Sequence, residues 1–350
     1  MSPVARRVQE QPVRNKSFDA SNDFAAIPKG VAASHKITMK TLIVMTSMTL
    51  LAIARGDNLD SRKSESRALL HRKDYNGALA QAKAIQKERP DDIESYQMMG
   101  TAQIALGDYV GAETSIQWML DLRIGKADTP GWLLVAHFRE VTGDVEGALD
   151  AVNLASSRIA VGVGHEHLGP KLLAYAGYLH LLAGRVSIAE QAVQGATDEM
   201  SIETLARIRM AQGRRDDAMQ LLRGLVAMNP HPRNLYKLAE MTGDYAGFEK
   251  AARRSRNEPD HANVELILYL AGPGKRPVEA LAMGWRESNE RQDVFTLDAL
   301  AMALQANGQR EQAHTLFNKV AAVGTRDPRI VSHLSQNLTL PISQPGPKMP

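Results

Sequence analysis

The sequence contains no cysteine, and aromatic residues make up only 5% of its 350 residues. The absence of cysteine excludes disulfides, thiolate metal sites, cysteine nucleophiles and lipid attachment to cysteine. Long alternating runs of Val, Ile and Thr are also missing, so the sequence predicts no β-sheet. Alanine, leucine and methionine are plentiful instead, and their side chains lose little freedom in a helix. The composition therefore favours an all-α protein.

Neither sign of charge dominates, since the formal net charge is +3. The excess is local, because residues 1–54 carry seven Lys and Arg against three Asp and Glu. The rest of the chain is nearly neutral, which gives no electrostatic reason to expect nucleic acid as a partner.

The longest apolar run is short. It covers residues 41–54, follows Met39-Lys40 and ends in Ala52-Ile53-Ala54. A basic start, a short apolar run and a small-x-small end are typical of a secretory signal peptide, here with cleavage after Ala54. Crossing a bilayer takes roughly 20 apolar residues, which is more than this run provides.

We therefore expect residues 1–54 to be a leader, with translation starting at Met39 and residues 1–38 a start-site artefact. The favoured location is the periplasm or cell envelope of a bacterium. Three alternatives remain open: an inner-membrane anchor formed by residues 41–54, an organelle transit peptide, and a cytosolic protein with a misread leader.

One six-residue pattern recurs along the chain, beginning with a turn residue and ending with a small one. Two copies are Gly107-Asp108-Tyr109-Val110-Gly111-Ala112 and Gly143-Asp144-Val145-Glu146-Gly147-Ala148. The last position falls at Ala78, Ala112, Ala148, Ala189, Ala218, Phe248, Ala280 and Ala313. These positions lie 29 to 41 residues apart. Each copy is preceded by a predicted helix, in which a large residue and a small one stand four positions apart, as in Tyr96 with Gly100. The small site recurs at Gly177.

In this spacing and pattern the chain resembles the tetratricopeptide repeat (TPR) family, of an exported bacterial type, over about residues 58–328. The resemblance implies a right-handed superhelical solenoid of about eight helix-turn-helix repeats, within residues 55–330. Glycine suits the end of each first helix, and the following Asp suits the start of the second. The small residues let the two helices approach closely. The tail, residues 331–350, is predicted to be disordered.

Some spacings depart from the repeat. The 41 residues between Ala148 and Ala189 predict an inserted loop at residues 160–170, and the short spacings around Ala218 and Phe248 predict shortened helices. The first repeat has Arg62 and Ser66 where the large and small residues belong. We interpret it as a polar cap, since terminal repeats are often atypical.

The sequence offers little catalytic chemistry. His165-Glu166-His167 is a weak candidate for metal binding, because two His flank an acid. No phosphate-binding loop and no Gly-x-Ser-x-Gly motif occur. We therefore predict no catalytic residue, no cofactor and no enzyme activity, and we keep a metal-binding or enzymatic protein using His165 and His167 as the alternative.

The TPR resemblance implies that a protein or peptide partner binds in a concave groove lined by the first helix of each repeat. On that register the predicted groove residues are Gln97, Thr101, Leu133, His137, Glu140, Tyr178, Arg207 and Met210. The predicted function is a protein–protein interaction scaffold in the bacterial cell envelope, including a membrane-associated complex. Neither nucleic acid nor a small-molecule substrate is expected, and a cytosolic TPR scaffold is the second alternative.

Overall fold

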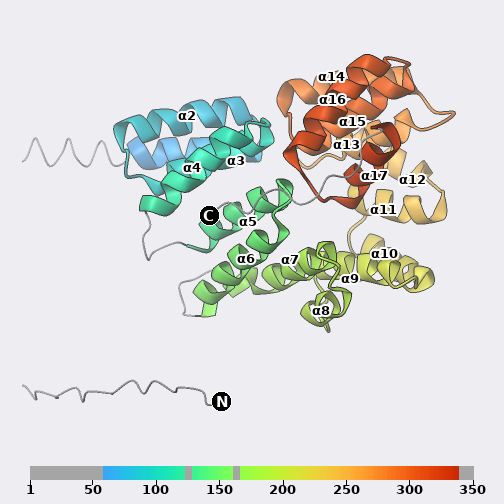
Figure 1. Ribbon diagram of the computed structural model, residues 1–350, viewed down its shortest axis with the longest axis horizontal. Coiled ribbons are helices and arrows are strands. Elements are labelled where there is room, and N and C mark those ends of the chain that lie inside the picture. Colours follow the sequence, from blue (N-terminus) through green and yellow to red (C-terminus); the bar gives the residue numbers. More distant parts are fainter. Residues whose placement is uncertain (1–57, 123–127, 161–165, 339–350) are drawn as a thin grey trace, which may run out of the picture. The chain divides into compact units, whose positions relative to one another are not determined.

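The computed structural model describes residues 58–122, 128–160 and 166–338 (Figure 1). The chain divides into Met1–Ile53 and Ala54–Pro350, and all described residues belong to the second part. The predicted leader therefore lies outside the described residues. Among the helices that are described, none is long and apolar enough to cross a membrane.

Every regular element in these three stretches is helical, and no strand occurs in them, which confirms the all-α prediction. The first helix covers residues 58–71. The next helices are α2 (Tyr75–Glu88), α3 (Ile93–Ala105), α4 (Tyr109–Leu122), α5 (Thr129–Val141) and α6 (Val145–Ala160). They are followed by the 3-10 helix η1 (Glu166–Leu168), α7 (Gly169–Leu182), α8 (Val186–Ala192), α9 (Glu199–Ala211), α10 (Arg215–Met228) and α11 (Pro232–Thr242). The last are α12 (Ala246–Arg254), α13 (Asn263–Ala271), α14 (Pro277–Glu290), α15 (Val294–Ala306), α16 (Arg310–Val323) and α17 (Pro328–Asn337).

Consecutive helices pack as eight pairs, which we call units 1 to 8, with helix A before helix B in each (Figure 1). Unit 1 combines residues 58–71 with α2. Units 2 to 8 are α3–α4, α5–α6, α7–α8, α9–α10, α11–α12, α13–α14 and α15–α16, and α17 follows unit 8. The predicted organisation into about eight TPR-like repeats is confirmed, while the right-handed superhelical sense stays a prediction.

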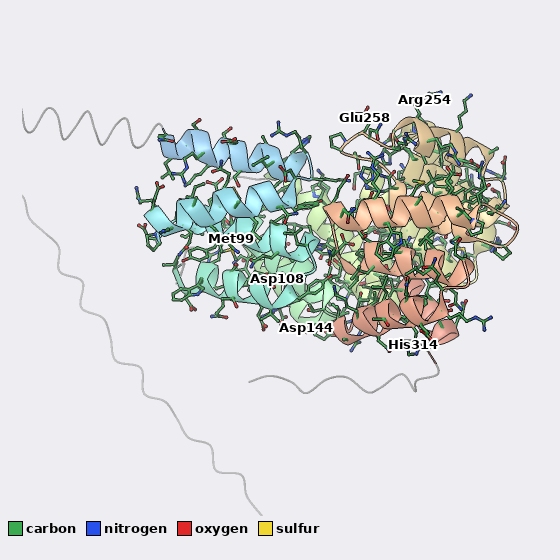
Figure 2. All side chains as sticks on the ribbon, turned by 90° about the horizontal axis from the view of Figure 1, so that it is seen from above. Met99, Asp108, Asp144, Arg254, Glu258 and His314 are labelled. Carbon is green, nitrogen blue, oxygen red and sulfur yellow. The ribbon has the colours of Figure 1, made fainter. Side chains whose placement is uncertain are left out.

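The turn inside each unit follows from its sequence. Gly107 adopts φ 72° after α3, in the left-handed region that glycine enters without a steric penalty. The carboxylate of Asp108 then accepts a hydrogen bond from the Gly111 N–H at 2.9 Å and caps α4. Asp144 caps α6 in the same way, and Figure 2 shows Asp108 and Asp144 at these two turns.

Small residues lie where the helices of a unit approach each other. The seven repeat alanines are all fully buried: Ala78, Ala112, Ala148, Ala189, Ala218, Ala280 and Ala313. Within unit 4, a Cβ added to Gly177 would lie 3.0 Å from Val193 Cγ1, and between units 2 and 3 one added to Gly100 would lie 3.1 Å from Leu134 Cδ2. These distances leave no room for a larger side chain, because interiors are closely packed.

Unit 1 has a buried serine at the site where the other units carry a small residue, while the rest of residues 58–71 is partly or fully exposed. Ser66 is fully buried, and its hydroxyl donates a hydrogen bond to the Ala78 carbonyl oxygen at 3.3 Å. Serine therefore takes the place of the small residue between helices A and B. The polar atom is tolerated there because it is hydrogen-bonded.

The irregular spacings have their own structural causes. The 29-residue spacing before Ala218 arises from α8, which is only 7 residues long, whereas α10 keeps 14 residues. The shortened helix predicted from the spacings around Ala218 is therefore α8. Around Phe248 both α12 and α13 are 9 residues long. Residues 161–165 of the loop predicted at 160–170 lie outside the described residues, whereas Glu166–Leu168 form η1 and Gly169 begins α7, so the inserted segment is partly helical.

The C-terminal boundary predicted at residue 330 is too early. Helix α17 continues to Asn337, and Asp327 caps it by accepting hydrogen bonds from the N–H groups of Arg329 and Ile330. Ile330 and Leu338 are both buried, so packing holds this helix against unit 8. The tail that remains outside the described residues begins at residue 339.

Candidate partner-binding site

Side chains on four successive A helices form contacts from each helix to the next, and we call these side chains the helix-A cluster. Its members are His137 and Glu140 on α5, Tyr175 and Tyr178 on α7, Glu203 and Arg207 on α9, and Lys237 on α11. They lie on the face of each A helix that carries the predicted groove positions. The cluster therefore includes four of the eight predicted groove residues.

The first part of the helix-A cluster joins units 3 and 4. The Tyr175 hydroxyl donates a hydrogen bond to the Glu140 carboxylate at 2.6 Å. His137 Nδ1 lies 3.6 Å from the same carboxylate, one helical turn away. Burial raises the pKa of Tyr175, and the Glu140 charge raises it further. Tyr175 is therefore a neutral hydrogen-bond donor that holds Glu140 in place, while the His137 side chain stays 51% exposed.

The second part joins units 4, 5 and 6. The Arg207 guanidinium lies over the Tyr178 ring, with Cζ 4.9 Å from the ring centroid. Arg207 also pairs with Glu203 at 2.6 Å, and Lys237 pairs with the other Glu203 oxygen at 2.5 Å. An Arg over an aromatic ring is attracted by the negative face of the ring. Glu203 is thus held between two cations from neighbouring units.

The charges in this part are matched to one another. Burial favours the neutral form of Glu203, but Arg207 and Lys237 outweigh it and lower the pKa of Glu203. Burial opposes the charge on Arg207, yet Glu203, Tyr178 and Asp327 together raise the pKa of Arg207. These shifts stabilise the charged forms of Glu203 and Arg207, and the Arg207 side chain remains 43% exposed.

The other predicted groove residues lie outside the cluster. Gln97 donates a hydrogen bond from Nε2 to Asp128 Oδ1 at 3.0 Å and so connects α3 to the start of α5. Thr101 is exposed and donates its hydroxyl hydrogen to the Gln97 carbonyl oxygen. Leu133 packs against the core of units 2 to 4, whereas Met210 is 42% exposed. Leu133 therefore contributes mainly to packing.

Sequence reasoning missed Tyr175 and Lys237. Tyr175 lies three residues before Tyr178 and was not assigned to the groove, although its hydroxyl reaches back to unit 3. Lys237 was missed because unit 6 is a degenerate copy whose register was not extended to α11. Applying the spacing of the other groove positions to α11 would have predicted Lys237 as a groove residue.

The structure gives little support to the alternative of a metal site at His165 and His167. His165 lies outside the described residues, and His167 is exposed. In the part of the chain that is described, the one set of three side chains with metal-ligand spacing is His261, Glu287 and Glu290.

That set does not suit a metal cation. His261 Nδ1 accepts a hydrogen bond from the Asn263 N–H at 3.3 Å, so the ring proton of neutral His261 is on Nε2, which points to Glu287 at 3.7 Å. Burial, together with the charges of Lys73, Arg291 and Arg233, lowers the pKa of His261 to about 4. The same three cations would repel a bound metal ion.

An apolar cleft of about 540 Å³ lies on units 1 and 2, away from the helix-A cluster. Its lining includes Pro90, Tyr96, Met99, Trp118 and Leu122. Tyr96 and Trp118 stack with their ring centroids 6.5 Å apart, and Trp118 stays 54% exposed. The sequence analysis did not identify this cleft, because it assigned the large residue Tyr96 to packing alone.

No protein-family model and no curated protein matches the chain. Among solved structures it is similar to a tetratricopeptide repeat protein from Parabacteroides merdae, at 15% identity and a TM-score of 0.41, covering 81% of this chain and 100% of that chain. It is also similar to yeast Tom70, at 11% identity and a TM-score of 0.44, covering 75% of this chain and 58% of that one. A third similar structure is the APC/C hetero-tetramer Cut9–Hcn1, at 15% identity and a TM-score of 0.43, covering 85% of this chain and 52% of that one.

Proposed function

We propose that the protein is an interaction scaffold, and that a peptide or protein partner binds across the helix-A cluster. The observation that carries this proposal is that contacts join each A helix to the next: Tyr175 bonds Glu140 across units 3 and 4, Arg207 lies over Tyr178 across units 4 and 5, and Lys237 pairs with Glu203 across units 5 and 6. These contacts present side chains from four separate units. Arg and Tyr are also the side chains that most often anchor interfaces.

The contacts within the cluster favour binding over catalysis. Glu203 is paired with two cations, Glu140 accepts a hydrogen bond from Tyr175, and burial keeps the two tyrosines neutral. His137 and Arg207 nevertheless stay about half exposed, with 51% and 43% of their side chains accessible. A partner can therefore contact them without breaking the pairs that fix their positions, which limits the entropy lost on binding.

The test compares two double variants. His137→Ala with Arg207→Ala removes the two exposed members of the cluster and leaves Tyr178, which is largely buried, in place. The control combines His314→Ala with Arg254→Ala, which removes the same residue types from exposed positions outside the cluster (Figure 2). Exposed substitutions usually change stability by within about 0.5 kcal/mol each, so both variants should keep their helicity.

Each variant is used to capture proteins from a native envelope extract, and the captured proteins are quantified by mass spectrometry. We expect the cluster variant to lose the partner that the wild type and the control variant both retain. Equal capture by all three proteins would contradict the proposed site and would direct attention to the cleft at Trp118.

We also propose that the protein acts in the bacterial cell envelope. The apolar run ending at Ala54 supports this location, because its length and ending suit signal-peptide cleavage. Mass spectrometry of the native protein should find an N-terminus at Arg55. A native protein in the cytoplasm that still begins at Met1 would refute export, and a chain retained in the inner membrane with residues 41–54 intact would support the anchor instead.

A further inference from the structure

Residues far apart in the sequence meet where units 2 and 3 contact the last units. The Gln292 N–H donates a hydrogen bond to the Ala105 carbonyl oxygen at 2.8 Å. The Val294 N–H donates to the Tyr109 hydroxyl at 3.0 Å, across a separation of 185 residues. These bonds connect the turn of unit 2 to the junction between units 7 and 8. They are outside the repeat pattern, which pairs only neighbouring units.

Two turn glycines show how close this approach is. A Cβ on Gly107 would overlap the Gln292 carbonyl oxygen, and a Cβ on Gly143 would overlap the Gly324 carbonyl oxygen. Gly184, Gly213 and Gly308 have the same turn conformation, with φ of 74–75°, but a Cβ on any of them would meet nothing within 4 Å. The glycines of units 2 and 3 are thus required for a long-range contact as well as for their turns.

We call this region the closure contact. It is formed by Gly107, Tyr109 and Gly143 on one side and by Gln292, Val294 and Gly324 on the other. A small apolar core lies behind it, in which Val141, Val294, Leu297, Val320 and Ile330 are buried together. The contact therefore combines backbone hydrogen bonds with apolar burial, and it connects the first units of the array to the last.

The turn of unit 1 lies on the same side of the closure contact, but buried polar atoms around it lack hydrogen-bond partners. Lys73 replaces the usual turn glycine and adopts φ 64°, in the left-handed region that is unfavourable for it. Its Nζ is buried near Glu287, yet Lys73 Nζ, Glu287 Oε1 and Asn263 Oδ1 have no hydrogen-bond partner within the described residues. Buried polar atoms without partners weaken a contact. This part of the interface therefore resists separation less than the core of a unit does.

The closure contact also fixes the start of α17 beside the helix-A cluster. Gly324 ends α16 against unit 3, and Asp327 begins α17 three residues later. The Asp327 carboxylate interacts electrostatically with Arg207 and Tyr178. As long as the contact holds, this segment lies near two members of the proposed binding surface.

We propose that the closure contact is a reversible latch, and that its opening moves the segment from Gly324 to Asp327 away from the helix-A cluster and widens the access of a bulky partner to it. The effect on partner access rests on the proposed function, whereas the opening of the closure contact concerns the chain alone. The two are tested separately, because neither measurement below requires a partner.

The opening variant is Gly107→Ala with Gly143→Ala, and the control is Gly184→Ala with Gly308→Ala. Both pairs place alanine at the same positive φ, so their local backbone cost is similar. Only the opening pair introduces overlap with a distant unit. Because the chain has no cysteine, spin labels can be attached at Glu113→Cys on α4 and Gln312→Cys on α16, both exposed positions.

We expect the opening variant to gain a population with a longer distance between labels, while the control keeps the wild-type distribution. Tyr109→Phe removes only the acceptor for the Val294 N–H and should shift the distribution less, in the same direction; it remains usable if the double variant fails to fold. Wild-type distances in both the double variant and Tyr109→Phe would overturn the latch, as would equal opening in the control.

Access is measured with a Met210→Cys variant, whose single thiol lies on α9 one turn from Arg207. Its rate of reaction with a maleimide on a bulky polyethylene glycol chain is divided by its rate with a small maleimide. This ratio should rise several-fold in the opening variant and stay constant in the control. Longer distances between the labels with an unchanged ratio of maleimide rates would refute the proposal that the latch governs access. They would leave the proposed binding site intact.

Discussion

Unit 6 provides the sharpest test of the packing argument, because Phe248 stands where seven other units have alanine. Replacing it with alanine restores the repeat pattern, so reasoning from the pattern alone predicts a neutral or stabilising change. The structure predicts the opposite. Phe248 is 1% exposed, and its ring contacts three tyrosines from unit 6 and helix A of unit 7.

The expected loss of stability on replacing Phe248 follows from those contacts. The Phe248 centroid lies 5.0 Å from that of Tyr236, 6.4 Å from that of Tyr245 and 6.0 Å from that of Tyr269, all in edge-to-face geometry. Removing a buried Phe side chain typically costs about 3–5 kcal/mol. Each aromatic pair contributes about 0.5–1.5 kcal/mol beyond its buried area, which places Phe248→Ala toward the upper end of that range.

The measurement is urea unfolding followed by circular dichroism at 222 nm, with Phe248→Leu as a control that retains most of the apolar volume. We expect Phe248→Ala to lose several times more stability than Phe248→Leu. Because repeat arrays can unfold in parts, amide hydrogen exchange should place the loss in α11, α12 and α13. A loss below about 1 kcal/mol, or a gain, would refute the argument that the aromatic group replaces the small-residue contact.

Two further predictions concern single side chains. Gly224 is exposed inside α10 with nothing within 4 Å of an added Cβ, so Gly224→Ala should stabilise by about 0.5–1 kcal/mol in thermal or urea unfolding. Gly284→Ala should be less stable than Gly224→Ala by about 1–3 kcal/mol, since its Cβ would lie 2.9 Å from the buried Leu300; equal effects would contradict the assigned contact. Burial lowers the pKa of His261 from about 6.5 to about 4. Between these two pH values the unfolded state binds a proton that the folded state does not, so the free energy of unfolding should fall as the pH falls through this window. His261→Gln should flatten that dependence, and an unchanged slope would show that other groups cause it.

The sequence predicted the parts of the fold that depend on neighbouring residues. Ala112, Gly100 and Gly107 recur at a fixed spacing, and each has a local physical reason to be small or flexible. The positions of His137 and Arg207 on one face also followed from that spacing, because helical periodicity fixes which residues share a face.

Long-range contacts could not be predicted in the same way. The bond between Tyr109 and Val294 depends on the sum of small rotations between successive units, and no residue pattern encodes that sum directly. Helix α8, which is only 7 residues long, lies between these two residues in the sequence. The tyrosines around Phe248 were likewise visible in the sequence, but their meeting depends on the short helices of units 6 and 7.

The closure contact has a consequence for the order in which the chain folds. Units 2 to 6 make mostly local contacts and can form as they are synthesised, whereas Tyr109 must wait for Val294, 185 residues later. At about 5–20 residues per second, that wait is roughly 10–40 s. During this interval Tyr109 and Val141 lack their final apolar partners and expose part of the surface that the completed chain buries. The newly made protein is therefore most vulnerable to aggregation and proteolysis at the turns of units 2 and 3, and a chain cut short before residue 294 would keep that vulnerability permanently.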